Sequence, residues 1–500
     1  MIKHATPERV AFPVEALAQF MQVLEKKEMR MHSVLMMRGE EIFFEKYWAP
    51  FTAQTPHRMY SVTKSFVAIA IGFLCQEGKL SLDDPIVRFF SDKLPESVPP
   101  LLQKQTVRHM LMMSTCFSGM NWFQPGVVDR TAFYFSHQPV KPAGALFDYD
   151  STGSYILGAL VERLSGMPLL EYLKSRVLNR LGGFESAHML KTPDGTAWGD
   201  SALICTPRAL AAFARFVMNL GAWEGEQILS REFLQAATAC QTTNDFTGHN
   251  AHDAWGYGYQ IWKTEQNGFA FNGMGCQFAI CLPEKDFIFV CTGDNQINRE
   301  QAGATIFGAV FDILVPALSG QSTQAESFDL DQPLSLRVAH GAAASPFAAA
   351  VQGKTYLCEE NPMGITRFSL EFGEDGAACF HYWNAQGEQR LEFGMQRNLY
   401  GKFPQRGFHR PRFALENEDF IGGVREQDGE NPGGRIADDI GQGFPQPRQQ
   451  QQFIQRQVGD DVDHGGQNAE YHITDGFPVD ELGKTAPHPP KERRAQQRDE

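Results

Sequence analysis

Ser61 and Lys64 are the two residues whose types and spacing most directly suggest chemistry. They lie in segment 59–65 (MYSVTKS), which runs into an apolar stretch over 66–74. Polar, cap-forming residues followed by about ten apolar or small residues predict a buried helix with Ser61 in its first turn. Residues three apart on a helix share a face, so we expect the two side chains to lie about one turn from each other.

A serine hydroxyl becomes a nucleophile when a neighbouring group takes its proton. A lysine can do this when burial and positive potential lower its pKa. A helix N-terminus supplies that potential together with a backbone N–H for an oxyanion. The pair therefore fits a serine/lysine acyl-transfer nucleophile. A chain this long shows roughly one Ser-x-x-Lys by chance, so the motif gains weight only from its context.

A second segment resembles the serine β-lactamase and penicillin-binding-protein superfamily. Segment 147–158 (FDYDSTGSYILG) is similar to the family's Tyr-x-Asn element, with Tyr149 at the tyrosine and Ser151 where many relatives have asparagine. The resemblance implies that Tyr149 shuttles a proton between the nucleophile and the leaving group. A serine at position 151 lacks the paired carbonyl and NH2 of an amide, so recognition of a substrate amide there departs from the family pattern.

A third segment, 271–278 (FNGMGCQF), corresponds to the family's Lys-Thr-Gly strand but lacks the lysine and the threonine. Gly273 and Gly275 mark close approach by another group to a strand, either a substrate carbonyl or a packed neighbour. By resemblance, the backbone N–H groups of Ser61 and Met274 would hold the oxyanion. Because the side chains that usually hold a substrate carboxylate are absent, penicillins and D-Ala-D-Ala peptides are expected to be poor substrates.

This departure moves the resemblance toward the esterase and 6-aminohexanoate-dimer hydrolase branch. That branch shares a Gly-x-x-Gly-Gln-type strand here, and Gln277 joins the candidate substrate-binding residues. Segment 255–262 (WGYGYQIW) is similar to the branch's aromatic strand beside the cleft. We expect one or two of these rings to touch substrate, with Trp262 as the candidate.

Other catalytic patterns fit less well. Segment 199–203 (GDSAL) matches the nucleophile block of another esterase class, but it lies in mid-chain. No Gly-x-Ser-x-Gly elbow, phosphate loop or dinucleotide fingerprint occurs. His249 and His252, with Asp245 and Asp253 nearby, are possible metal ligands, yet loop histidines beside aspartate are common without metal. We therefore expect neither a metal nor a cofactor.

Hydrophobic periodicity predicts the elements that position the first motif. Apolar residues at helical spacing predict an amphipathic helix over 13–27. Segments 32–38 and 41–47 predict a hairpin with its turn at Gly39-Glu40. Helical patterning with Pro and Gly breaks over 81–221 predicts an inserted helical lobe. The order of helix, hairpin and nucleophile helix is how the superfamily opens.

Strand patterns return at 256–264, 270–282 and 287–292, and a helix over 302–314 is expected to stop at Pro316. The early hairpin and these late strands are expected to share one antiparallel sheet, because each alone leaves an apolar face uncovered. The expected fold class is α/β of the α+β type. The resemblance specifies the β-lactamase/transpeptidase-like fold, an antiparallel sheet flanked by helices plus a helical lobe.

Composition divides the chain into four parts. The expected serine hydrolase domain spans 1–320, and a polar linker follows over 321–336. Short strand-like runs between turns predict a small β domain over 337–410, which stops where further strands would be expected. Residues 411–500 have few apolar residues and no periodicity, which predicts a disordered tail.

Length and charge limit location and partners. With 500 residues and 42% hydrophobic content, the chain can bury a sizeable core. An excess of 59 acidic over 45 basic residues argues against a nucleic-acid or anionic-membrane partner. Nine cysteines without metal-type pairs, and a start without an apolar signal core, favour a cytoplasmic protein. No apolar run in the sequence approaches the length expected of a membrane span.

The leading hypothesis is a serine hydrolase that cleaves a small ester or linear amide through an acyl-enzyme on Ser61. Lys64 and Tyr149 would move the proton, without a cofactor. One alternative is a D-Ala peptidase or β-lactamase. A non-catalytic binding module that keeps the fold is another, favoured by the altered third motif and by Ser151. The acyl group, the leaving group and the oligomeric state do not follow from the sequence.

Overall fold

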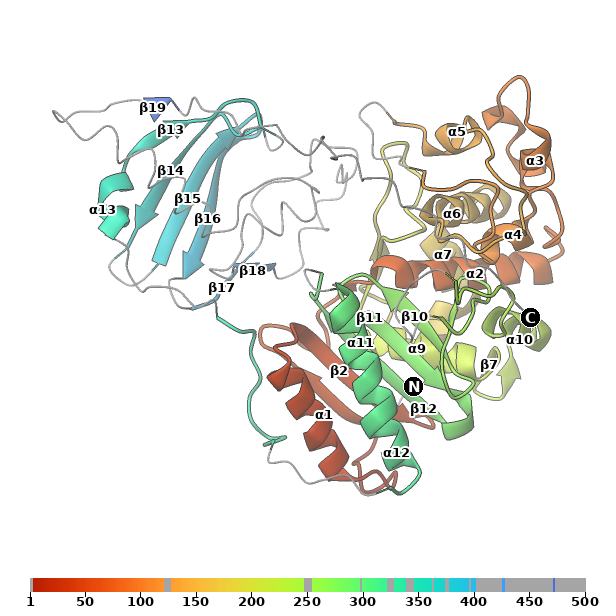
Figure 1. Ribbon diagram of the computed structural model, residues 1–500, viewed down its shortest axis with the longest axis horizontal. Helices are drawn as coiled ribbons and strands as arrows, with labels where there is room; N and C mark the ends of the chain where they lie inside the picture. Colours follow the sequence, from red (N-terminus) through yellow and green to blue (C-terminus); the bar gives the residue numbers. More distant parts are fainter. Residues whose placement is uncertain are drawn as a thin grey trace, which may run out of the picture.

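A seven-stranded sheet with the order β1-β3-β2-β12-β11-β10-β9 lies at the centre of the protein (Figure 1). The computed structural model describes residues 3–120, 127–246, 254–296, 299–321, 328–338, 346–361, 364–373, 377–394 and 397–401, with short strands at 425–427 and 471–472. The strands of this sheet are β1 Lys3–His4, β2 Met31–Arg38, β3 Glu41–Tyr47, β9 Trp262–Lys263, β10 Phe269–Gly273, β11 Gln277–Leu282 and β12 Phe287–Gly293. All neighbours pair antiparallel except β1 and β3. The expectation that the early hairpin and the late strands share one sheet is confirmed.

Helices cover both faces of this sheet because its central strands are apolar on both sides. On one face lie α1 (Val14–Lys26) and α11 (Arg299–Ala309), which run side by side in Figure 1. Their apolar residues join a core with the sheet, in which Phe20 meets Phe289 edge to face at 5.4 Å. The other face packs against α9 (Pro207–Met218) and, beyond it, the nucleophile helix. The sheet thereby supports the helix that carries Ser61 and Lys64.

The helix after β12 continues past its expected end. α11 is followed by a π-helical turn, Val310–Leu314, and by α12, Val315–Leu318. Pro316 was expected to stop the helix, but it lies near the start of α12, where a proline is tolerated after the wider turn. Residues Gln301–Leu318 are long and apolar enough to cross a membrane, contrary to the sequence reading, and 56% of this window is buried inside the protein, as in a core helix.

A helical lobe lies between the early and late strands, as expected. Its helices are η2 Ile86–Phe89, η3 Ser91–Lys93, α3 Pro100–Gln103, α4 Val107–Leu111, α5 Arg130–Phe135, α6 Ser151–Ser165, α7 Leu169–Leu173, the π turn Lys174–Leu178 and α8 Asn179–Leu181. Further elements are β4 His57–Arg58, β5 His188–Met189, β6 Leu203–Cys205, β7 Ala222–Trp223, β8 Glu226–Gln227 and α10 Arg231–Thr238. β4, β5 and β6 form a small sheet of their own.

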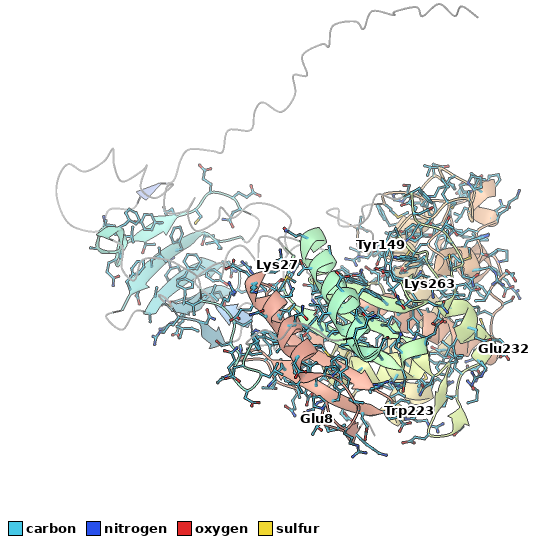
Figure 2. All side chains as sticks on the ribbon, turned by 60° about the horizontal axis from the view of Figure 1, so that its bottom comes forward. Glu8, Lys27, Tyr149, Trp223, Glu232 and Lys263 are labelled. Atoms are coloured by element: carbon cyan, nitrogen blue, oxygen red, sulfur yellow. The ribbon has the colours of Figure 1, made fainter. Side chains whose placement is uncertain are left out.

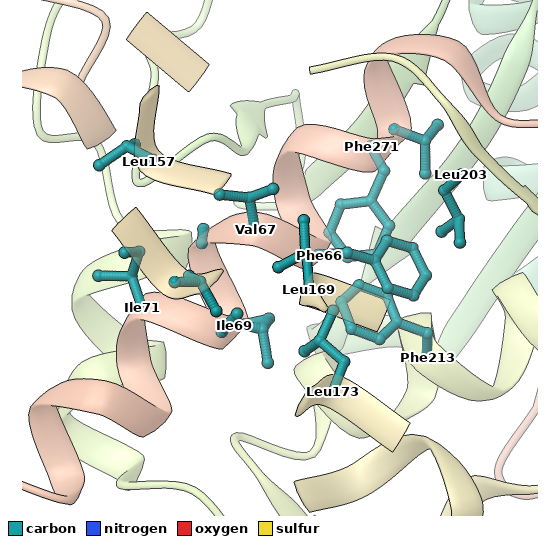
Figure 3. Close-up of a cluster of buried hydrophobic side chains, with 14 of the residues drawn as sticks. Phe66, Val67, Ile69, Ile71, Leu157, Leu169, Leu173, Leu203, Phe213 and Phe271 are labelled. Carbon is teal, nitrogen blue, oxygen red and sulfur yellow. The ribbon is translucent and has the colours of Figure 1, made fainter. Parts of the chain in front are cut away.

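The nucleophile helix joins the lobe to the sheet. It begins with a 3-10 turn, Tyr60–Val62, and continues as α2, Thr63–Gln76, whose residues are buried from Thr63 to Leu74. Phe66 stacks on Phe213 of α9 with ring centroids 3.6 Å apart (Figure 3). A helix that is apolar all round is buried on every side. α2 is therefore held in place by packing on all sides, and this packing also restrains the turn that contains Ser61.

Two of the expected late strands have a different shape. Segment 256–264 forms only the short strand β9, because the chain turns at Gly256 (φ +108°) and Gln260 (φ +56°). Segment 270–282 is a hairpin of β10 and β11. Its turn holds residues 274–276, and Gly275 has a φ of +81°. Met274 therefore lies in a turn and not within a strand.

A second sheet, β16-β15-β14-β13-β19, lies outside the main core. It contains β13 Thr355–Leu357, β14 Arg367–Phe372, β15 Ala377–Asn384, β16 Gly387–Gly394 and β19 Tyr471–His472; α13 Pro346–Val351 precedes it, and β17 Leu399–Gly401 pairs with β18 Arg425–Gln427. The proposed domain boundaries at 321–336 and 337–410 stay predictions. Apart from β18 and β19, the predicted disordered tail lies outside the described residues.

Candidate active site

The 3-10 turn before α2 brings Ser61 and Lys64 together. The Lys64 Nζ donates a hydrogen bond to Ser61 Oγ at 3.0 Å and another to the backbone oxygen of Asp200 at 2.8 Å. Lys64 is 1% exposed, whereas Ser61 is half-buried. Tyr60 has a φ of +46°, a left-handed backbone that a bulky residue adopts only where the surroundings impose it. The turn is therefore strained, and it presents the Ser61 hydroxyl beside a buried amine.

Tyr149 lies at the junction of the sheet and the helical lobe (Figure 2). Its ring lies over Lys64, with Nζ 5.1 Å from the centroid, as in a cation–π contact. Within the described residues the Tyr149 hydroxyl makes no hydrogen bond. The three expected groups thus converge, but tyrosine meets lysine through its ring. Catalytic hydrogen bonds often tighten only when substrate is bound.

Aromatic side chains hold Tyr149 in place. Trp262 stacks on it with centroids 5.5 Å apart, and Tyr257 meets it edge to face at 6.5 Å. Phe147 and Tyr257 are buried beneath this layer together with Met113. Trp262 itself is half-buried. The structure therefore places Trp262 beside the catalytic candidates, where it can form a wall for an apolar part of a substrate.

Ser151 is the first residue of α6, two residues after Tyr149 in the sequence. The helix is capped by the preceding residue, Asp150, whose carboxylate accepts from the Thr152 N–H at 2.9 Å and from Thr115 Oγ1 at 2.9 Å. Among the residues that the structure describes, none makes a hydrogen bond with the Ser151 hydroxyl. Because Asp150 provides the cap, the partly exposed Ser151 remains available to a ligand.

The β10–β11 turn packs directly against the Ser61 turn. A Cβ added to Gly273 would lie 2.4 Å from the Met59 backbone oxygen, so only glycine permits this approach. In the described part of the chain, neither the Ser61 N–H nor the Met274 N–H donates to a backbone carbonyl. Two backbone donors without a backbone acceptor are compatible with the predicted oxyanion role.

Gln277 is placed differently from its predicted role. It is fully buried, and its Nε2 donates to the Met274 oxygen at 2.9 Å and to the Gly293 oxygen at 2.7 Å. Its Oε1 accepts from the Gly293 N–H at 3.2 Å. Both ends of the amide are engaged within the protein, so in this structure Gln277 holds the β10–β11 turn in shape.

Replacing Gly273 by alanine is expected to lower kcat for ester hydrolysis by about 10²-fold, because a displacement near 1 Å in a catalytic turn has effects of this size. The new methyl group would push the Met59 oxygen and thus the Ser61 turn. Gly308→Ala in α11 is the matched control, since its Cβ would only meet Asp312 at 3.7 Å. Equal activity of the two variants would contradict the role of this contact.

Gln260 is a site-shaping residue that the sequence did not single out. Its side chain is buried, accepts from Ser154 Oγ at 2.6 Å and donates to the Met110 oxygen at 2.9 Å. Its backbone oxygen accepts from Ser65 Oγ at 2.7 Å. These bonds tie the aromatic loop to α2, α4 and α6. Its left-handed φ of +56° is imposed by these contacts, and apart from the neighbouring Gly256 and Gly258 no feature of the sequence indicated it.

Asp200 is a second residue whose role the sequence did not predict. The GDSAL match drew attention to Ser201, but the Ser201 oxygen accepts from Arg58 Nε at 3.1 Å, whereas the Asp200 oxygen binds Lys64. The Asp200 side chain is only 4% exposed. Burial raises the pKa of its carboxyl, and the charges of Lys64, Arg130 and Arg58 oppose that shift.

Possible metal ligands do not gather in the part of the chain that the structure describes. No group of three or more His, Cys, Asp or Glu side chains suited to a metal occurs there. The candidates His249, His252 and Asp253 lie outside the described residues, and Asp245 is described.

The chain is similar to several known proteins. The sequence model of the Beta-lactamase family matches residues 16–302. The 6-aminohexanoate-dimer hydrolase of Paenarthrobacter ureafaciens is 24% identical over 297 residues, 54% of this chain and 74% of that protein. Esterase EstB of Burkholderia gladioli is 28% identical over 181 residues, 31% of this chain and 45% of the esterase. The structure of a proposed 6-aminohexanoate-dimer hydrolase from Bacillus anthracis has a TM-score of 0.52 at 16% identity and covers 61% of this chain and 83% of that one, which shows a shared fold.

Proposed function

Because this chain belongs to the Beta-lactamase family, we propose that it is a serine hydrolase that cleaves a small ester or linear amide through an acyl-enzyme on Ser61. The observation that carries the proposal is the 3.0 Å contact between the Lys64 Nζ and the Ser61 Oγ. Relatives named 6-aminohexanoate-dimer hydrolase and Esterase EstB support a hydrolase function.

In the proposed mechanism, Ser61 Oγ attacks the substrate carbonyl carbon and its proton passes to the amine form of Lys64. The carbonyl oxygen becomes an oxyanion, which accepts hydrogen bonds from the Ser61 and Met274 N–H groups. The bond to the leaving group then breaks, and the departing alcohol or amine takes the proton through Lys64 and the Tyr149 hydroxyl. Water attacks the acyl carbon in the second half-reaction, returns a proton to Ser61 and releases the acid.

The proposed substrates are small and carry no carboxylate near the scissile bond. The lysine and threonine side chains that hold such a carboxylate in the superfamily are absent from segment 271–278 (FNGMGCQF). Trp262, together with Tyr149, presents an aromatic wall beside the nucleophile. Aromatic walls suit the apolar parts of uncharged substrates. Esters and linear amides therefore fit better than penicillins.

Covalent labelling by two probes tests the proposal. A fluorophosphonate phosphonylates an activated serine without needing a matched substrate, whereas a fluorescent penicillin requires recognition of its carboxylate. We expect labelling by the fluorophosphonate alone, followed by turnover of some members of a panel of p-nitrophenyl esters and short linear amides. Labelling by both probes would favour a D-Ala peptidase or β-lactamase. A folded sample that neither probe labels would favour a non-catalytic binding module.

A further inference from the structure

We propose that the ion pair between Lys141 and Asp148 positions the Tyr149 hydroxyl for protonation of the leaving group. Lys141 and Asp148 are then positioning residues, which act on the reaction through Tyr149. The inference rests on the proposed serine hydrolase function, in which the departing alcohol or amine takes its proton through Lys64 and the Tyr149 hydroxyl.

The Tyr149 hydroxyl is not held by hydrogen bonds of its own. Within the described residues it has no such bond, and the printed contacts of the side chain are ring contacts. The ring centroid lies 5.1 Å from Lys64 Nζ, 5.5 Å from the Trp262 ring and 6.5 Å from the Tyr257 ring. Such contacts stabilise the ring without bonding its hydroxyl. The place of the hydroxyl therefore depends on where the backbone of residue 149 is held.

Side chains alternate between two sides along residues 147–150. Phe147 and Tyr149 both lie against Trp262, with ring centroids 5.9 Å and 5.5 Å away. Successive side chains of an extended chain point to opposite sides, and Asp150 has an extended backbone. Asp148 and Asp150 accordingly bond to groups outside the aromatic cluster. One side of this segment packs on rings, and the other is held through two carboxylates.

Lys141 holds the first of these carboxylates. Its Nζ donates a hydrogen bond to Asp148 Oδ2 and forms an ion pair with it, and the two side chains are 16% and 30% exposed. The Asp148 N–H donates to the Met113 oxygen at 2.7 Å, and the Lys141 N–H donates to the Cys116 oxygen at 3.3 Å. Both partners are thus also bonded to segment 113–116. The ion pair closes a loop that is anchored at both ends, immediately before Tyr149.

The second carboxylate, on Asp150, has a structural role as well. It accepts from Thr115 Oγ1 at 2.9 Å and from the Thr152 N–H at 2.9 Å, and the latter bond caps α6. Removing it would disturb the helix together with Tyr149. The Lys141–Asp148 pair caps no helix, so it is the anchor of Tyr149 that can be removed with less effect on the fold.

Two substrates with the same acyl group and different leaving groups provide the test. p-Nitrophenolate departs without a proton, whereas the alcohol of an ethyl ester has to receive one. We expect Lys141→Met to lower kcat/KM for the ethyl ester by about 10²-fold, at the low end of general acid–base contributions, and to leave the p-nitrophenyl ester nearly unchanged. Because kcat/KM reports the steps up to the acyl-enzyme, the shared deacylation step does not enter. Lys141→Arg keeps the cation and should retain most of the activity.

A double-mutant cycle shows whether Lys141 acts through the Tyr149 hydroxyl. Tyr149→Phe removes that hydroxyl and should lower kcat/KM for the ethyl ester at least as much as Lys141→Met does. Adding Lys141→Met to Tyr149→Phe should then cause no further loss, because no hydroxyl remains to be positioned. Losses that multiply would show that the ion pair acts independently of the hydroxyl and would overturn the inference.

Lys93→Met is the matched control. Lys93 Nζ lies 2.6 Å from Asp129 Oδ2 in another lysine–aspartate pair of the helical lobe, with side chains 31% and 39% exposed. This variant should leave both esters unaffected. Circular dichroism establishes that each variant is folded. If Lys141→Met does not fold, Asp148→Asn takes its place, because asparagine keeps the shape and the backbone N–H of Asp148 and removes its charge.

The remaining outcomes separate the inference from the proposed function. Equal losses of the two esters in folded Lys141→Met, or no loss of either, overturn the inference and leave Ser61 as the nucleophile. Wild-type protein that cleaves the p-nitrophenyl ester and no ethyl ester overturns it as well, since no leaving group is then protonated. Wild-type protein that cleaves neither ester and is not labelled by the fluorophosphonate overturns both.

Discussion

Replacing Ser61 by alanine is expected to reduce turnover of any substrate of this protein to the background rate. Loss of the nucleophile in serine hydrolases lowers kcat on the order of 10⁶-fold, because no other group can form the acyl-enzyme. Substrate binding should change little, since the hydroxyl contributes one hydrogen bond to Lys64 and is half-buried. Initial rates with p-nitrophenyl esters, measured on protein expressed in parallel with the wild type, provide the readout.

The Ser61→Ala variant should remain folded. The substitution removes one hydrogen bond, which typically contributes ~1 kcal/mol, and Lys64 keeps its bond to the Asp200 oxygen. A shift of a few degrees in Tm is therefore the expected limit for stability. Ser201→Ala is a suitable control, because that serine belongs to the GDSAL segment and, within the described residues, its side chain is not hydrogen-bonded to Lys64. If ester hydrolysis were lost in Ser201→Ala and kept in Ser61→Ala, Ser201 and not Ser61 would be the nucleophile.

Replacing Lys64 by alanine is expected to lower kcat/KM by about 10³-fold or more, the usual effect of removing a general base. Because Lys64 is 1% exposed, alanine also leaves a cavity and an unpaired Asp200 oxygen. Truncation of a long buried side chain costs about 2–5 kcal/mol, so lower stability could be mistaken for lost chemistry.

Lys64→Met separates these two effects. Methionine has a similar length and fills most of the space, so it should be more stable than the alanine variant while showing a similar loss of activity. Activity of Lys64→Met within tenfold of the wild type would show that the amine is not the base. Tm and kcat/KM measured on the same preparations decide between the two outcomes.

Hydrophobic periodicity in the sequence was sufficient to predict the helices and strands that pack against one another. The helical spacing before Lys27 and the alternation around Gly39 predicted α1 and the β2–β3 hairpin close to their observed bounds. The uniformly apolar stretch 66–74 predicted a buried helix, because a helix with no polar face has no surface to expose. The sheet shared by early and late strands followed from the need to cover both apolar faces.

Backbone turns within apolar sequence could not be predicted in the same way. The composition around Met274 is that of a strand, yet the chain reverses at Gly275 so that β10 and β11 pair. Segment 256–261 likewise has the aromatic content of a strand, but Gln260 adopts a left-handed φ and is buried by bonds to Met110 and Ser154. Here tertiary contacts override local propensity.

Contacts between site residues that are far apart in the sequence could not be predicted either. The Ser61 and Lys64 pair was visible because both residues are in one turn. Asp200 lies far along the chain, and its motif suggested a competing nucleophile, whereas its backbone oxygen accepts a hydrogen bond from Lys64 Nζ. Gln277 was assigned to substrate because its sequence neighbours border the site, but its buried side chain is hydrogen-bonded to the backbone of Met274 and Gly293.

Peptide mapping by mass spectrometry after fluorophosphonate treatment shows directly whether Ser61 is the nucleophile. We expect one added phosphonyl group per chain, located on the peptide that contains Ser61 and absent from the Ser61→Ala variant. An adduct on Ser201 or on any other residue, or an unmodified Ser61 in folded and fully treated protein, would contradict it.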